Sequence, residues 1–538
     1  MPDPTSNFLQ ALDTRKFPAF SLNGLPGFPY TEYQSRNAIY IENERWANGE
    51  ILRETVNVNN KEVQRFPVEI NPVPGVILKH AYALFGESNQ DDRPLVYPRV
   101  LTKDKAKRDI AHEAEEMLYR VWWESNGRSI QFENGIMSQT YGGCVFQITY
   151  DTLDPLRTVP LRIDNPHPKY FVGRPAANDM WRLQEAWIVK PVTVGEAAQN
   201  GIDSSFITDD VAWQVEHYTT TTYETTINGQ PIRRYVDGEW MSLDGINPWG
   251  FVPIVYIPHI RMGSSFYGVN AFDGARGLVK ELNRRVADFG DAISVDSHAY
   301  VGMRNVQGSP KVQQIAPNLF AVNVGGATNI TGDADKPDLF EIKRPSASAP
   351  MQTLIDELNN EIRRAVNVPK VADGEDEGSQ RSGLTLAMRM WPLVSHTNTE
   401  RVFWTSGLDL LNRMILKMLS IKGEQNITID HTVLRIKENW FPVLPRDREM
   451  TVNEAVSRMG SNLGSIDHLL GMLGDVDDIE EEKKLIIEYL KQIAEIEAKA
   501  APTSGTPNPG AKPNRPAKNP QQKQSTTGTQ TKQAQSSE

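Results

Sequence analysis

The feature that most constrains this chain is a long apolar seam between residues 269 and 294. Its apolar side chains recur in alternating steps of three and four, which is typical of a helix that packs along one face; they are Phe272, Ala275, Val279, Leu282, Val286, Phe289 and Ile293. As a helix at about 1.5 Å per residue, Val269–Ser294 would be roughly 39 Å long, longer than most helices of a globular domain. Such a helix needs a packing partner along its whole length.

A second helical face returns after about fifty residues rich in Gly, Pro, Val and Asn. Its apolar positions are Met351, Leu354, Leu358, Ile362 and Ala365, again one face of a helix. The segment between the helices carries the β-type runs YVGMRNV and LFAVNV among turn residues, and insertions of this length are usually functional. The plain alternative is two core helices of an ordinary domain, separated by a small β-domain that touches nothing else.

Length and composition limit the class of protein. A chain of 538 residues allows two to four domains. We expect no membrane span, because no apolar run approaches the required length, and no secretory signal, because MPDPTSNFLQ has neither a basic nor an apolar region. A single cysteine, Cys144, excludes an intramolecular disulfide and a cysteine zinc cluster, and suggests synthesis in the cytoplasm.

The charge is unevenly distributed. The net charge is −11; the last 39 residues carry five Lys or Arg against one Glu, or +4, which leaves −15 for Met1–Lys499. An acidic body is unsuited to gripping nucleic acid over a broad surface, because tight phosphate binding needs clustered cations. It does not exclude a surface past which DNA slides.

The rest of the chain alternates helical and strand patterns. Residues 1–70 appear irregular, strands dominate from 144 to about 260, and hairpin turns are expected at Asn228-Gly229 and Asp237-Gly238. Pro392 should kink or break the helical pattern of Gly383–Ile421, and residues 501–538 should be disordered because they lack apolar side chains. Helices are expected at 74–85, 103–124, 130–140, 449–459, 465–473 and 478–500.

No motif of catalysis or metal binding is complete. GSSFYGVN has two glycines of a phosphate loop but lacks the lysine, and HEAEE lacks the second histidine of a zinc protease helix. The acidic stretch at Asp475 fails the calcium-loop pattern, and the nine histidines are scattered, with no ligand pair recognised at helical spacing. We therefore expect no enzyme activity, no cofactor and no metal.

The order of these segments resembles the portal proteins of tailed bacteriophages over roughly 74–500. The matching stretches are NPVPGVILKHAYALFGES, FENGIMSQTYGGCVFQITYD, NPWGFVPIVYIPH with GSSFYGVNAFDGARGLVKELNRRVADFGDAI, VPKVADGEDEGSQRSGLTLAMRMWPL, and FPVLPRDREMTVNEAV with GSIDHLLGMLGDVDDIEEEKKLIIE. Each is loose alone, and it is their order and spacing together that carry the resemblance.

The resemblance implies an α+β portal subunit with these parts: a mixed wing (1–265), a first stem helix (266–294), a β-containing clip (295–345), a second stem helix (346–369), a tunnel loop (370–383), a long kinked helix with the wing return (384–440), a helical crown (441–500) and a disordered tail (501–538). Stem packing would use Phe272, Val279, Leu282, Val286, Phe289, Leu354, Leu358 and Ile362. The tunnel loop would present Asp373, Glu375, Asp376, Glu377, Gln380 and Arg381, and the clip would dock through Asn318, Leu319, Phe320, Val322 and Val324.

The resemblance also implies a function. Portal proteins form a homo-oligomeric ring, twelve copies in virions, at the capsid vertex, through which double-stranded DNA is packaged and ejected. The implied partners are the large terminase, major capsid and scaffold proteins and a neck adaptor protein, and the implied location is the virion after assembly in the host cytoplasm. Two alternatives stay open: a minor head or neck adaptor protein, which would not need the excursion between two helices, and a packaging enzyme, which would need a phosphate loop. The tunnel loop also has a plainer interpretation as a solvated turn.

Overall fold

Two compact units make up the chain, Met1–Arg446 and Asp447–Glu538. The first combines helices with antiparallel strands and the second is helical where it is described, so the chain is α+β. Among the described residues, no helix has both the length and the apolar character that a membrane crossing requires. The computed structural model describes residues 22, 25, 27–49, 55–58, 61–64, 69–86, 93–151, 156–199, 202, 211–236, 239–242, 244–296, 301–304, 311–316, 319–323, 338–341, 348–374, 383–422, 434–444, 448–461, 463–473 and 479–500.

The core of the first unit forms around a three-stranded antiparallel sheet in the order β14-β4-β5. Its strands are β4 (Gly143–Tyr150), β5 (Leu161–Asp164) and β14 (Ile254–Pro258). Successive side chains of a strand point to opposite faces, and both faces of β4 are covered, because Cys144 and Phe146 lie in one apolar cluster and Val145 in another. Burial raises the pKa of the Cys144 thiol well above its usual value, which is typical of a structural rather than a reactive cysteine.

A helix of 32 residues, α10 (Trp391–Lys422), packs on this sheet. Close approach requires glycine at position 407, because a Cβ there would lie 2.4 Å from Cγ1 of Ile257 in β14. The expected break at Pro392 is present: α9 (Gly383–Arg389) ends just before α10 begins, and Pro392 lies in the first turn of α10. A proline costs no hydrogen bond there.

Three helices and a strand pair complete this core. The helices are α3 (Val73–Phe85), α4 (Arg108–Glu124) and α5 (Gly127–Tyr141), and the antiparallel pair is β3 (Tyr97–Thr102) with β19 (Leu434–Asn439). A buried polar relay crosses the core from α4 to β19. Trp122 Nε1 donates to Asn412 Oδ1 at 2.9 Å, and Asn412 Nδ2 donates to Glu438 Oε1 at 3.0 Å. Buried polar groups generally need such partners.

A larger antiparallel sheet follows the order β10-β9-β8-β7-β6, with β13 beside β9. Its strands are β6 (Phe171–Ala176), β7 (Asp179–Thr193), β8 (Val211–Thr219), β9 (Thr222–Ile227), β10 (Gln230–Pro231) and β13 (Gly245–Ile246). The predicted turn between β9 and β10 is confirmed, since Asn228 and Gly229 have φ of 48° and 78°, both positive as a type I′ turn requires.

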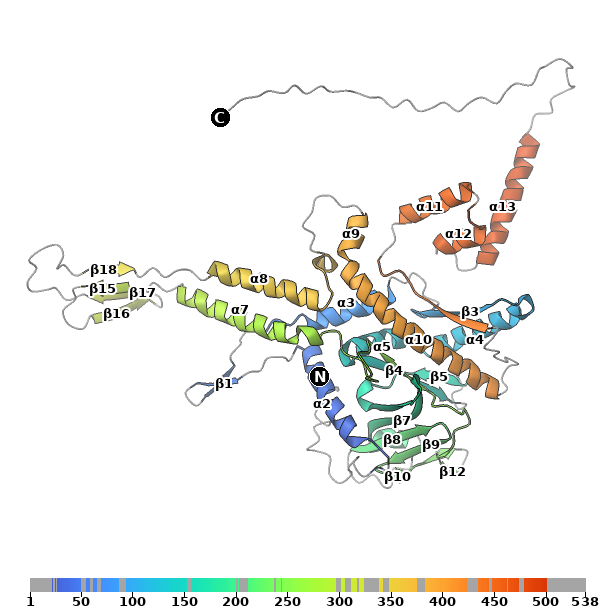
Figure 1. Ribbon diagram of the computed structural model, residues 1–538, viewed down its shortest axis with the longest axis horizontal. Coiled ribbons are helices and arrows are strands. Elements are labelled where there is room, and N and C mark those ends of the chain that lie inside the picture. Colours follow the sequence, from blue (N-terminus) through green and yellow to red (C-terminus); the bar gives the residue numbers. More distant parts are fainter. Residues whose placement is uncertain are drawn as a thin grey trace, which may run out of the picture. The chain divides into compact units, whose positions relative to one another are not determined.

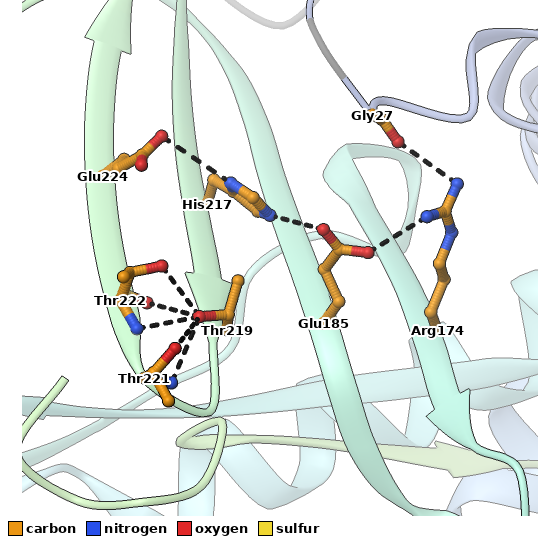
Figure 2. Close-up of polar contacts among 8 residues, drawn as sticks. All are labelled: Gly27, Arg174, Glu185, His217, Thr219, Thr221, Thr222 and Glu224. Carbon is orange, nitrogen blue, oxygen red and sulfur yellow. Dashed lines mark hydrogen bonds and ion pairs between the residues drawn. The ribbon is translucent and has the colours of Figure 1, made fainter. Parts of the chain in front are cut away.

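Polar side chains connect neighbouring strands of this sheet (Figure 2). The Glu185 carboxylate on β7 lies between Arg174 Nη1, at 3.0 Å, and His217 Nε2, at 2.9 Å. The Arg174–Glu185 pair joins β6 to β7, and opposite charges on adjacent strands stabilise a sheet. On the other side, His217 Nδ1 lies 3.9 Å from Glu224 Oε2 on β9.

The expectation of irregular structure in residues 1–70 is wrong, because this region contains the 18-residue helix α2 (Tyr30–Ala47). Its buried positions are Tyr33, Arg36, Tyr40, Asn43 and Trp46, a set with two polar members and therefore no clear apolar face. Tertiary contacts satisfy those two: Asn43 Nδ2 donates to the Thr140 carbonyl at 2.8 Å, and the Arg36 guanidinium donates to the Phe171 carbonyl. Packing rather than pattern therefore stabilises α2.

The remaining elements are short or belong to the second unit. Two hairpins are β1 (Thr55–Val58) with β2 (Lys61–Gln64) and β11 (Arg233–Val236) with β12 (Glu239–Ser242), and α6 (Val194–Gln199) follows β7. The expected turn at 237–238 and the tail at 501–538 lie outside the described residues. The second unit contains α11 (Arg448–Gly460), α12 (Ile466–Leu473) and α13 (Ile479–Ala500), close to the three predicted helices.

Candidate functional site: the helical pair α7 and α8

The apolar seam forms α7 (Arg276–Asp296), preceded by a 3₁₀ turn at Asp273–Ala275. The helix begins later than the expected Val269, because the Val269 amide donates to the Ile260 carbonyl at 3.0 Å in a β-type bridge. Asn270 Oδ1 then accepts from the Phe272 amide at 3.0 Å, a local turn that competes with a helix. With 21 residues, α7 is about 31 Å long.

The returning helix, α8 (Ser348–Ala365), lies beside α7 and runs antiparallel to it (Figure 1). It ends in a Schellman motif: the Val368 amide donates to the Arg363 carbonyl at 3.0 Å, and the Asn367 amide donates to the Arg364 carbonyl at 3.2 Å. Asn367 takes the left-handed position with φ of 55°, which asparagine tolerates well. The helix ends before Pro369, as Val368-Pro369 predicts.

Most of the predicted stem-packing residues meet in one apolar cluster. Four are buried there, Phe272, Val279, Leu282 and Ile362, and three are partly buried, Val286, Phe289 and Leu358. Leu354 lies outside the cluster with 44% of its surface exposed, and the neighbouring Ile355, 9% exposed, occupies the buried position.

The seam of α7 finds its partners within the chain. Besides α8, the cluster includes Trp46 of α2 and Val73, Val76 and Ile77 of α3. The apolar face of α7 is therefore covered within a single chain. The length of α7 alone is not evidence that a second subunit packs against it. Among the described large apolar side chains of the pair, Ile293 and Leu354 are exposed, at 49% and 44%.

The outer surface of the pair carries balanced charge. α7 has four basic and four acidic residues, and α8 has two basic and three acidic ones, a total of −1. Many of these pair locally: Arg285 lies 2.7 Å from Glu281 and 3.2 Å from Asp288. Exposed pairs of this kind contribute little stability, but they leave a surface without a concentrated positive field.

Asp373, predicted in the tunnel loop, lies in a 3₁₀ turn (Lys370–Asp373) directly after α8. Its carboxylate is engaged twice, since Oδ2 lies 2.6 Å from Arg363 Nη1 and Oδ1 contacts Lys79 Nζ of α3. Asp373 therefore connects α8 to α3 through ion pairs with Arg363 and Lys79. The other predicted loop residues, Glu375, Asp376, Glu377, Gln380 and Arg381, lie outside the described residues.

In the segment between α7 and α8, the described residues form two antiparallel strand pairs. They are β15 (Val301–Arg304) with β18 (Asp338–Glu341) and β16 (Lys311–Ala316) with β17 (Leu319–Asn323). Of the predicted docking residues, Leu319, Phe320 and Val322 belong to β17, whereas Asn318 and Val324 lie outside the described part of the chain.

A cluster of buried polar side chains lies near the start of α7 and the end of α8 and was not predicted from the sequence. His259, His396 and Glu400 bring one potential metal-binding atom each within 4.8 Å of one another, and the His80 ring lies 4.6 Å from the His396 ring. Burial lowers the pKa of His259 to about 3 and raises that of Glu400 to about 8. The missed signal is the four-residue spacing of His396 and Glu400, which places both on one face of α10.

Comparison with known protein families gives a match that includes the helical pair α7 and α8. A sequence model of the family described as "Phage portal protein, SPP1 Gp6-like" matches residues 209–502, a span that includes α7, the strand segment, α8, α10 and the helices α11, α12 and α13 of the second unit. A search of curated proteins finds no match. The match covers more than half of the chain, and the chain therefore belongs to the phage portal protein family, SPP1 Gp6-like.

Proposed function

We propose that this chain is the subunit of a ring, twelve copies in the virion, that forms the DNA channel at a capsid vertex. The observation that carries the proposal is the family match over 209–502, because it spans the two helices and the excursion between them. In this assignment α7 and α8 are the stem, the strand segment is the clip, the large sheet belongs to the wing and the second unit is the crown.

Exposed apolar side chains support assembly. On the helical pair these are Ile293 and Leu354, and on α13 they are Leu485, Ile487, Tyr489 and Leu490, each more than 40% exposed. Apolar side chains gathered on one element favour burial against another chain. In a ring, the stem helices of adjacent subunits would cover Ile293 and Leu354.

The charge of the chain supports a conduit for double-stranded DNA. A surface that neutralised six to ten phosphates would bind with an affinity that varies by about three to five orders of magnitude between low and moderate salt, and such binding would stall translocation. The near-neutral helical pair and the net charge of −11 avoid this. The polar segment 375–382 would reach the channel from its anchor at Asp373.

We assign the surface that binds partner proteins to the strand segment between α7 and α8. Two-stranded units are marginally stable alone and their free edges seek partners, so β15–β18 and β16–β17 would pair with neighbouring subunits, the large terminase or a neck adaptor protein. The major capsid and scaffold proteins would contact the ring from the capsid side. Replacing Asn318–Gly325 by a Gly-Ser linker should give heads that fail to join tails or recruit the packaging motor.

The decisive test is the state of assembly of the purified chain. Native mass spectrometry and negative-stain imaging should show a closed ring of about ten or more copies, formed alone or with the scaffold protein, and an ATPase assay should show no turnover. A chain that stays monomeric even with scaffold protein would contradict the proposal and favour a neck adaptor. Turnover of ATP would favour a packaging enzyme.

A further inference from the structure

The buried polar cluster consists of His259, His396 and Glu400, with His80 beside them. Each of these side chains has a lone pair that can accept a hydrogen bond or bind a metal ion. His259 Nδ1 lies 2.8 Å from the Val269 carbonyl and His80 Nε2 lies 2.8 Å from the Val366 carbonyl. A carbonyl only accepts, so each of these nitrogens carries the ring proton. The opposite nitrogens, His259 Nε2 and His80 Nδ1, are left unprotonated, and both are buried without a hydrogen-bond partner among the described residues.

Glu400 adds a carboxylate oxygen to this arrangement. Its Oε1 accepts from Gln139 Nε2 at 2.6 Å, and its Oε2 lies 3.8 Å from His259 Nε2. The Trp404 indole also interacts with this carboxyl group, but neither Oε2 nor Trp404 Nε1 makes a full hydrogen bond among the described residues. Glu400 and His259 are 0% and 1% exposed. Buried polar atoms left without a full hydrogen bond are costly, and a cation bound between His259 Nε2 and Glu400 Oε2 would displace the carboxyl proton and contact both groups.

His396 completes the donor set from α10. Its Nδ1 lies 3.4 Å from Asn367 Nδ2, an amide nitrogen that only donates, so Nδ1 accepts in this arrangement. Zinc binding through Nε2 would require the proton on Nδ1 and the Asn367 amide turned so that its oxygen accepts. His396 Nε2 is also buried and, within the described residues, unpartnered. The Val269 carbonyl that holds the His259 ring matches the outer hydrogen bond that orients a histidine ligand.

We propose that His259, His396 and Glu400 bind a zinc ion, with the His80 ring, whose centroid lies 4.6 Å from that of His396, beside the site. Two imidazoles with one carboxylate suit Zn²⁺ and do not suit the oxygen-seeking Ca²⁺ and Mg²⁺. The ion would join α10 to the residue that follows β14, and through the Val269 carbonyl it would fix the segment that leads into α7.

The test uses the full-length chain, purified without a histidine tag and stripped with a chelator. Adding ZnCl₂ should load about one ion per chain by elemental analysis, as one mononuclear site requires, and should raise the unfolding temperature. CoCl₂ should give the visible absorption bands of tetrahedral Co²⁺, a direct report on the ligands. Glu400→Gln and His259→Gln should each weaken affinity by more than about tenfold.

His217→Gln is the matched control, because His217 also lies against a carboxylate, at 2.9 Å from Glu185 (Figure 2), and is remote from the cluster in sequence. It should bind zinc as the unmodified chain does. Zinc and Co²⁺ binding by the unmodified chain tests the proposal even if the Glu400→Gln and His259→Gln variants fail to fold. No Co²⁺ bands, no bound zinc and no thermal shift would overturn the proposal and indicate a water molecule or shared proton in the cluster. Equal loss of affinity in His217→Gln would overturn it in favour of surface binding.

Discussion

Glu438 allows the sharpest quantitative prediction, because it is a carboxyl group buried in the apolar core. It is 6% exposed, its Oε1 accepts from Asn412, and its Oε2 has no hydrogen-bond partner among the described residues. Burial raises the pKa of Glu438 from 4.5 to about 8. The folded chain therefore keeps this proton at neutral pH, where the unfolded chain has lost it.

The sign of the effect follows from proton linkage. Stability from a raised carboxyl pKa is fully present below pH 4.5 and falls as the pH rises towards 8, because the unfolded state then binds fewer protons. Each pH unit in this window costs about 1.4 kcal/mol, so Glu438 alone should reduce the free energy of unfolding by roughly 2–3 kcal/mol between pH 5.5 and 7.5. Glu438→Gln keeps an acceptor for Asn412 and removes the titrating group, so it should stabilise the fold at pH 7 by up to about 3 kcal/mol.

Urea unfolding followed by tryptophan fluorescence measures this, since Trp122 hydrogen-bonds Asn412 in the same relay. Protein concentration must be held constant, because subunit association changes apparent stability. Glu116→Gln is the control: its side chain is 61% exposed on α4, and it should change stability by less than about 0.5 kcal/mol. Parallel pH curves for Glu438→Gln and the unmodified chain would refute the reasoning.

Four further changes test other parts of the structure. Gly268→Ala would place a Cβ 2.3 Å from the Gly142 carbonyl oxygen and should lower the free energy of unfolding, measured in urea, by about 1–3 kcal/mol. Gly290→Ala, which has open space around it in α7, should raise the free energy of unfolding by about 0.5–1 kcal/mol. Equal effects of the two substitutions would contradict the close approach of Gly268 to Gly142. Leu354→Lys should leave subunit stability within about 0.5 kcal/mol yet reduce ring formation in native mass spectrometry, and intact rings would exclude Leu354 from the contact. Asp373→Asn should cost about 1 kcal/mol and increase hydrogen exchange at the end of α8, and unchanged exchange would show that its ion pairs are not needed there. Removing residues 501–538 should leave assembly and thermal unfolding unchanged, and a lost ring would contradict the prediction of a disordered tail.

Local pattern was enough to predict the elements with strong periodicity. The seam of α7, the face of α8 and the amphipathic α4 are visible in the sequence because one helix face repeats every three to four residues. Proline and glycine marked the break before α10 and the turn at Asn228-Gly229 for stereochemical reasons that are equally local. Portal membership also followed from the order of segments in the chain, and the family match confirms it.

Only the tertiary structure decided which surfaces meet. The sequence shows that α7 has an apolar seam, but not that α8, Trp46 and α3 cover it, because contact partners far apart in the chain leave no periodic signal. For the same reason α2 was missed, since its buried Arg36 and Asn43 look like surface residues until the Phe171 and Thr140 carbonyls are in place. The cluster of His259, His396 and Glu400 arises where β14 meets α10, and no single segment of the sequence contains it.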